Sequence, residues 1–233
     1  MKTSDFHKLI TDFFSIYLPA HRNFSKNTIS SYCDTFSLLF QYISVETKRP
    51  VERLDINYIN SELIYSFLTW LEEKRHSSVA TINQRLSCFH TFFRYIQIVK
   101  PELSYEAQII LGIPFRKKPQ TTILYLTPDN IRLLLNQPDT STKRGRRNLT
   151  LLSLLYDSGA RVQEIADLTV ESVRLEPPAQ VKLIGKGSKA RVVPLMQNTV
   201  NLLKGYLEEN DLLLSHKFQF PLFSNSRNEK LTR

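Results

Sequence analysis

The stretch Tyr156-Asp-Ser-Gly159-Ala-Arg161-Val-Gln-Glu164-Ile-Ala-Asp-Leu168 decides how the second half of this chain folds. An apolar helical pattern over 149–156 leads into it, and Gly159 can adopt the positive φ that ends a helix. Arg161 then stands at the start of another short helix. The pattern therefore predicts a rigid corner between two helices that presents one arginine.

A second motif follows, with its lysine 25 residues after Arg161. It reads Gly185-Lys186-Gly187-Ser-Lys189-Ala-Arg191-Val-Val-Pro194-Leu195. The residues around it predict two strands, over 181–184 and 190–195, joined by a turn that glycines flank. Lys186 would lie at the tip of this turn, where its side chain could reach into a groove.

Together the two motifs resemble the catalytic domain of tyrosine recombinases, the Xer-type and phage-type integrases. That family carries an arginine in Thr-Gly-Leu-Arg-Val-Ser-Glu-Leu and then a lysine on a Gly-Lys-Gly hairpin. Ser158, Ala160 and Gln163 replace the more usual Thr, Leu and Ser, while the rest of both motifs stays in register. The resemblance implies that Arg161 clamps the scissile phosphate and that Lys186 protonates the departing 5′ oxygen.

The family's other catalytic residues do not occur in this sequence. They are a His-x-x-Arg pair, a later His or Trp, and a tyrosine nucleophile that attacks the phosphodiester. The segments 221–223 and 231–233 resemble the lead-in to the His-x-x-Arg helix. We therefore expect an integrase truncated before these motifs, which binds DNA without cleaving it. Tyr206 and His216 are poor substitutes, because both precede the family's positions.

The composition agrees with a basic globular protein. Its 233 residues are 42% hydrophobic, enough for one large or two modest cores. The formal net charge of +9 favours a polyanionic partner, because positive potential attracts phosphates. Cys33 and Cys88 lie in apolar helical patterns, so both are expected to be reduced core residues of a cytoplasmic protein. No apolar run approaches the roughly 20 residues of a membrane span.

The N-terminal half shows four helical periodicities and no strand pattern. Serines before the second and fourth are suitable N-caps, and prolines mark the ends of the first and fourth. The first expected helix covers 6–17 and is closed by Pro19, and the second follows Ser25 and carries 29–43. The third covers 59–71. The fourth follows Ser77 or Ser78, carries 82–96 and ends near Pro101.

Polar and basic side chains cover the outer faces of the second and fourth of these helices. Such groups near helix N-termini can bind phosphates, and Asn, Gln and Arg can also read base edges. The alternative is an ordinary solvated face. The half resembles the SAM-like core-binding domain of the same recombinases, one jaw of a clamp around DNA, which favours DNA binding by the set. Its members are Arg22, Lys26, Asn27, Thr28, Thr81, Asn83, Gln84, Arg85 and Arg94.

A proline-rich basic segment separates the two halves. We interpret it as an interdomain linker in which Arg116, Lys117 and Lys118 cross a DNA backbone; the alternative is a basic loop without a partner. Thr127 and Pro128 then start a helix over 128–136.

These elements predict a mainly α protein with a small β-hairpin or sheet. A helical core-binding domain is expected at 1–115, a linker at 116–124, and the first part of a mixed α/β catalytic domain at 125–233.

Several charged residues have two interpretations. Glu164 could orient the Arg161 guanidinium, or it could be an acid favoured by the helix dipole. The basic run 143–147 is expected to precede the next helix and could contact phosphates or be solvated. Lys189 and Arg191 are expected to contact a DNA backbone or solvent rather than to act in catalysis.

No metal or cofactor is expected. The five histidines are dispersed, and the sequence has neither a phosphate-binding glycine loop nor a dinucleotide fingerprint. The resemblance implies site-specific strand exchange through a 3′-phosphotyrosine by a homotetramer on two synapsed DNA sites with inverted repeats. The alternatives are a noncatalytic DNA-binding regulator or decayed integrase, and a helical protein-interaction module.

Overall fold

The computed structural model describes residues 5–51, 54–118, 125–214, 217–225, 227 and 229–231. The chain divides into two compact units, Met1–Thr122 and Ile123–Arg233, and each is described by itself. The expected linker at 116–124 stays a prediction, since residues 119–124 lie outside the described part.

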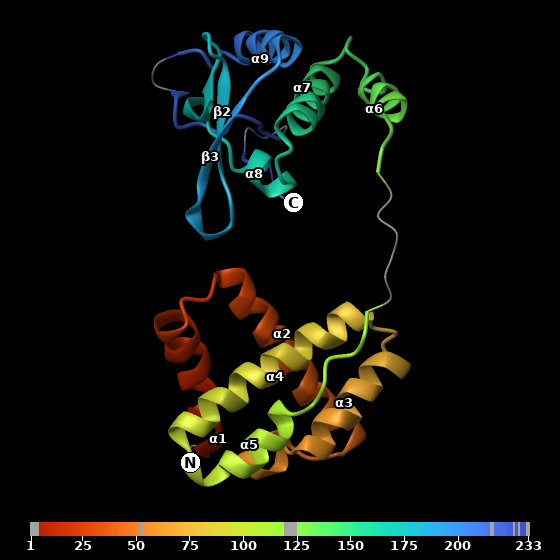
Figure 1. The fold of residues 1–233 in the computed structure, drawn as a ribbon, viewed down its shortest axis with the longest axis vertical. Coiled ribbons are helices and arrows are strands. Elements are labelled where there is room, and N and C mark those ends of the chain that lie inside the picture. Colours follow the sequence, from red (N-terminus) through yellow and green to blue (C-terminus); the bar gives the residue numbers. More distant parts are fainter. Residues whose placement is uncertain are drawn as a thin grey trace. The chain divides into compact units, whose positions relative to one another are not determined.

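Unit 1 is a helical bundle (Figure 1). Aromatic side chains dominate its core, and Phe13, Phe67, Phe89 and Phe92 are all fully buried. The Phe13 and Phe92 rings meet edge to face, with centroids 5.0 Å apart. The elements are α1 (Asp5–Asp12), a π-helical continuation (Phe13–His21), α2 (Lys26–Glu46), α3 (Ser61–Glu73), α4 (Val79–Val99) and α5 (Ser104–Leu111), with 3-10 turns at Ile56–Tyr58 and Pro101–Leu103.

The expected helix starts are set by side-chain caps. Ser25 Oγ accepts a hydrogen bond from the Thr28 amide at 3.3 Å, and Ser78 Oγ accepts one from the Thr81 amide at 3.2 Å. Both serine caps are therefore confirmed. The helix expected from residue 59 starts instead at Ser61, because the Asn60 side chain caps it.

Three expectations for this unit are wrong. Pro19 does not close the first helical segment, because wider π-helical turns continue through it to His21 and relieve the clash of the proline ring with an earlier carbonyl. Cys33 is exposed on α2, whereas Cys88 is buried as expected. The short helix α5 was not anticipated; its Ala107 and Ile110 complete the core.

Unit 2 combines helices with a three-stranded antiparallel sheet of order β1-β2-β3 (Figure 1). Val181 and Leu183 of β2 are buried with Leu154 of α7 and Leu203 of α9 in one core. The elements are α6 (Pro128–Leu135), α7 (Lys143–Ser158), α8 (Val162–Ala166), β1 (Val173–Arg174), β2 (Gln180–Ile184), β3 (Ala190–Pro194) and α9 (Gln197–Glu209), with 3-10 turns at Val170–Ser172 and Lys186–Ser188.

The main features of unit 2 agree with expectation. The helix at 128, the corner at Gly159 and both strands are present, and β1 is an unanticipated third strand. The run 143–147 is the first turn of α7 and does not precede it, because Thr142 Oγ1 caps the Gly145 amide at 3.0 Å. Among the described residues, no helix combines the length and the hydropathy that crossing a membrane requires.

Gly159 is expected to be intolerant of a side chain. It ends α7 at φ 58°, whereas Gly205 lies within α9, and an added Cβ would meet nothing within 4 Å at either site. Gly159→Ala should therefore lower the unfolding free energy of unit 2 by roughly 1 kcal/mol through backbone strain alone. Gly205→Ala should raise it by about 1 kcal/mol, because alanine favours helix. Chemical denaturation of both variants measures the difference; equal effects would contradict the assignment of strain.

Candidate functional site

Arg161 stands at the corner between α7 and α8. Gly159 ends α7 in the left-handed conformation, and the amide of Ala160 donates to Ser158 Oγ at 3.3 Å. Arg161 then has extended backbone angles and precedes the first residue of α8. Its side chain is 73% exposed. The corner therefore presents the guanidinium to solvent from a fixed backbone.

The Glu164 carboxylate binds both Arg161 and Arg191. The Arg161 amide donates to Oε2 at 2.8 Å, and Arg161 Nη1 donates to Oε1 at 3.0 Å. Arg191 of β3 forms a two-pronged contact, from Nη1 to Oε1 at 2.9 Å and from Nη2 to Oε2 at 2.7 Å. The two interpretations of Glu164 thus combine: it contacts the Arg161 guanidinium and also caps the start of α8.

These contacts determine the charge state of Glu164. Its side chain is only 5% exposed, and burial by itself would favour the neutral acid. The hydrogen bonds from Arg191 and from the Arg161 amide outweigh that effect and lower the pKa of Glu164 to about 2. The carboxylate is therefore ionised throughout the neutral range.

The β2–β3 turn approaches the same carboxylate. The Gly185 amide donates to the Lys189 carbonyl at 2.8 Å, and Gly187 has φ 75°. A Cβ built on Gly185 would lie 3.0 Å from Glu164 Oε1. Lys186 is the first residue of the 3-10 turn, and its side chain lies outside the described part of the structure. Gly185, the residue before Lys186, therefore lies directly beside the Glu164 carboxylate.

The structure brings part of the predicted DNA-binding set of unit 1 together. Asn27 and Thr28 of α2 line a groove of about 370 Å³ with Gln84 of α4. Gln84 Nε2 also donates to Ser31 Oγ at 2.5 Å and connects the two helices. The groove lies between the helix starts whose polar faces had been singled out. Arg22, Lys26, Lys117, Lys118 and Arg94 are exposed.

Other members of the set have partners within the fold. Asn83 exchanges two hydrogen bonds with the Arg116 backbone, at 2.8 and 2.9 Å. The Arg116 guanidinium forms an ion pair with Glu72. Arg85 Nη1 donates to Thr35 at 3.2 Å, and burial lowers the pKa of this arginine. Thr81 takes part in the cap of α4. A DNA contact by any of these residues stays a prediction.

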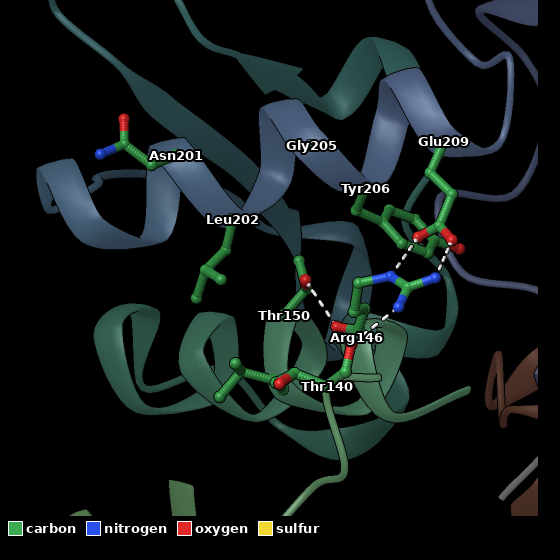
Figure 2. A pocket seen from close by; sticks show the side chains of 9 residues that line it. Thr140, Arg146, Thr150, Asn201, Leu202, Gly205, Tyr206 and Glu209 are labelled. Atoms are coloured by element: carbon green, nitrogen blue, oxygen red, sulfur yellow. Dashed lines mark hydrogen bonds and ion pairs between the residues drawn. The ribbon is translucent and has the colours of Figure 1, made fainter. Parts of the chain in front are cut away.

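A separate cavity of about 360 Å³ lies between α7 and α9 (Figure 2). Arg146 reaches across it, and its Nε and Nη2 donate to Glu209 at 3.1 and 2.5 Å. Arg147 Nη1 donates to the Ser224 carbonyl at 2.7 Å. Two cations of the run 143–147 thus serve the fold. Tyr206 lines the cavity, is 4% exposed, and has its pKa raised by burial.

Sequence reasoning missed the contact between Arg191 and Glu164. The available signal was strand alternation, because Arg191 pairs with buried Leu183 and residues that pair directly share one face of a sheet. His216 lies outside the described residues. Within the described residues, no group of three or more potential metal ligands occurs.

Two family models match the chain. Residues 11–97 match the N-terminal SAM-like domain of phage integrases. Residues 124–233 match the phage integrase family.

Curated relatives align with nearly the whole chain. The putative integrase/recombinase y4rC of Sinorhizobium fredii is 35% identical over 96% of this chain and 66% of its own length. The corresponding y4rD protein is 33% identical over 97% of this chain and 80% of its own length. Tyrosine recombinase XerD of Vibrio cholerae is 26% identical over 91% of this chain and 67% of its own length. The chain therefore spans only part of each relative.

Solved structures share the fold. XerH site-specific recombinase bound to palindromic difH substrate superposes with a TM-score of 0.65 and 24% identity, over 91% of this chain and 60% of that one. A lambda integrase(75-356) dimer bound to a COC′ core site gives a TM-score of 0.62 and 15% identity. The match covers 97% of this chain and 75% of that one. The expected fold class, a SAM-like bundle with a mainly helical α/β unit, is confirmed.

The depressed pKa of Glu164 makes stability depend on pH in the acid range. A carboxyl whose folded pKa lies below its unfolded value contributes stability above the unfolded pKa, about 4.3, and loses it toward the folded value of about 2. Unit 2 should therefore lose stability between roughly pH 4.5 and pH 2, and Glu164→Gln should remove part of that decline, because Asp139, Asp167 and Glu209 also have lowered pKa values. Chemical denaturation of the wild-type chain and the variant at a series of pH values measures how the unfolding free energy declines. Glu208→Gln, at an exposed position of α9, is the control and should leave the decline intact.

Proposed function

Because the chain belongs to the phage integrase family of tyrosine recombinases, we propose that it binds the DNA of a recombination site and that Arg161 contacts the phosphate at which strands are exchanged. Exchange by the complete protein would pass through a 3′-phosphotyrosine on synapsed sites held by a homotetramer. The XerH structure contains a palindromic substrate, which supports an inverted-repeat site.

The observation that carries this proposal is the exposed guanidinium of Arg161 anchored on a buried carboxylate. Only Nη1 of the guanidinium contacts Glu164, and no hydrogen bond among the described residues engages Nε or Nη2. Two parallel N–H donors of this kind match the nonbridging oxygens of a phosphate. The anchored arginine can thus stabilise negative charge that grows in the transition state, with little reorganisation.

Lys186 is proposed to supply the proton for the departing 5′ oxygen. A lysine on a turn can lie beside a leaving group without sharing the arginine's phosphate contacts. The same turn carries Lys189, which is exposed and is proposed to contact the neighbouring DNA backbone. The family relationship and the placement of Gly185 beside Glu164 support this assignment.

Arg161→Ala should weaken binding to an inverted-repeat duplex by roughly tenfold, because a charged hydrogen bond to phosphate contributes about 1.5 kcal/mol or more. The slope of log affinity against log salt should fall by about one, since one phosphate contact is lost. Fluorescence anisotropy at several salt concentrations measures both quantities.

Arg132→Ala is the charge-matched control. Arg132 lies on exposed α6 and pairs with Asp129, outside the proposed contacts. If both variants bind DNA equally well, Arg161 is not a phosphate ligand. If the wild-type chain prefers no inverted repeat over random duplex, the site-specific function fails.

The 233-residue chain is expected to bind nicked target DNA without forming a covalent adduct. The sequence lacks the family's His-x-x-Arg pair, and Tyr206 is packed against Phe223 with ring centroids 5.2 Å apart. A denaturing gel of DNA incubated with the chain, with and without proteinase, makes the test. A proteinase-sensitive shifted band would show that another tyrosine of the chain acts as nucleophile.

A further inference from the structure

We propose that Arg191 is a positioning residue, which acts through the Glu164 carboxylate to hold Arg161 and the turn that begins at Gly185 in one fixed arrangement. The inference rests on the proposed function, because it assigns a role to Arg191 in placing the two groups proposed to meet the phosphate. It differs from the expectation that Arg191 contacts DNA directly.

The strand register places Arg191 on the same face of β3 as the half-buried Val193, and the Arg191 side chain is 40% exposed. Arg191 pairs with Leu183, and Val193 of the same strand pairs with Val181. Leu183 and Val181 are fully buried, and directly paired residues of antiparallel strands project from the same face. The side chain of Arg191 therefore leaves β3 on the core side of the sheet. Its two terminal nitrogens both bind Glu164, which reduces what it can offer a DNA backbone.

Each carboxylate oxygen accepts one hydrogen bond from each arginine. Oε1 is shared by the two Nη1 atoms, and Oε2 is shared by the Arg161 amide and Arg191 Nη2. Loss of Arg191 would leave the 5% exposed Glu164 side chain with half of its donors. An under-satisfied buried carboxylate is costly, so it would draw the Arg161 guanidinium inward and take it from the phosphate.

The backbone at Gly185 adds the turn to this arrangement. A Cβ there would stand 3.0 Å from Glu164 Oε1 and 3.6 Å from Arg191 Nη1, closer to the oxygen than most side chains tolerate. Gly185 also closes the turn through Lys189. Its conformation is extended, with no positive φ, so close approach is the reason that glycine is needed here. A carboxylate that moves toward the turn would therefore displace the residue that precedes Lys186.

The first test needs no DNA. The Glu164 carboxyl is titrated by carbon-detected NMR in the full 233-residue chain, and the Arg161 Nε–H and Gly185 amide signals are recorded. Arg191→Ala should raise the Glu164 titration midpoint and shift both signals. Arg191→Lys should restore part of the midpoint, because lysine supplies charge but not the two-pronged geometry. Lys182→Ala removes the same charge from an exposed position of β2 and should change nothing.

The second test is a double-mutant cycle on DNA affinity. If Arg191 acts through Arg161, Arg191→Ala should weaken binding about threefold or more in the wild-type chain, and less than about twofold when Arg161 is already alanine. If Arg191 contacts DNA itself, the two losses add and the salt slope falls with each. Additive losses would overturn the inference.

The two tests separate the inference from the proposed function. If Arg161→Ala leaves DNA binding intact, the proposed function fails, while the NMR shifts still decide whether Arg191 positions Arg161. Unchanged Arg161 and Gly185 signals in both Arg191 variants would overturn the inference. Should Arg191→Ala fail to fold, the comparison of Arg191→Lys with the wild-type chain makes the same decision.

Discussion

The buried carboxylate of Glu164 is the constraint on which the proposed site depends. Burial alone would raise its pKa and favour the neutral acid, yet two guanidinium groups and a backbone amide keep it ionised. A buried charge is tolerated only in a geometry that satisfies most of its lone pairs. The corner that carries Arg161 and the strand that carries Arg191 must therefore meet at this carboxylate, and the absence of a side chain at Gly185 leaves room for it.

At the proposed phosphate site, this arrangement orients the donors before any phosphate binds. Arg161 is anchored by one nitrogen and remains 73% exposed, so its other donors need little reordering. Electrostatic stabilisation is most effective when donors are fixed in advance, because the cost of orienting them is met during folding. The same principle explains why Glu164 has a rigid place on a short helix rather than on a free loop.

In unit 1 much of the polar surface near the starts of α2 and α4 holds the fold together. The Asn83 side chain forms two hydrogen bonds with the Arg116 backbone and so fixes where the chain leaves the bundle. Gln84 connects α4 to α2. The charges left exposed are fewer than the sequence suggests, and they include Lys26 and Lys117.

The sequence by itself determined the two-part organisation, the cap at Ser25, a cap at Ser77 or Ser78, the corner at Gly159 and the hairpin, because each follows from local spacing and backbone preference. It also led to Arg161 and Lys186 through the family resemblance. It could not show that Pro19 lies within a helical segment, since π-helical turns leave no distinct periodicity.

Only the tertiary structure showed that Arg191 binds Glu164. Glu164 lies 27 residues earlier in the chain than Arg191, and the contact exists because β3 pairs with β2 in a register that turns Arg191 toward α8. A long-range pairing of this kind depends on how the strand and the helix pack, which local sequence does not encode. The same holds for the Asn83 amide and the Arg146 guanidinium. The sequence suggests that both are solvated, and only the packing shows that they bind the Arg116 backbone and Glu209.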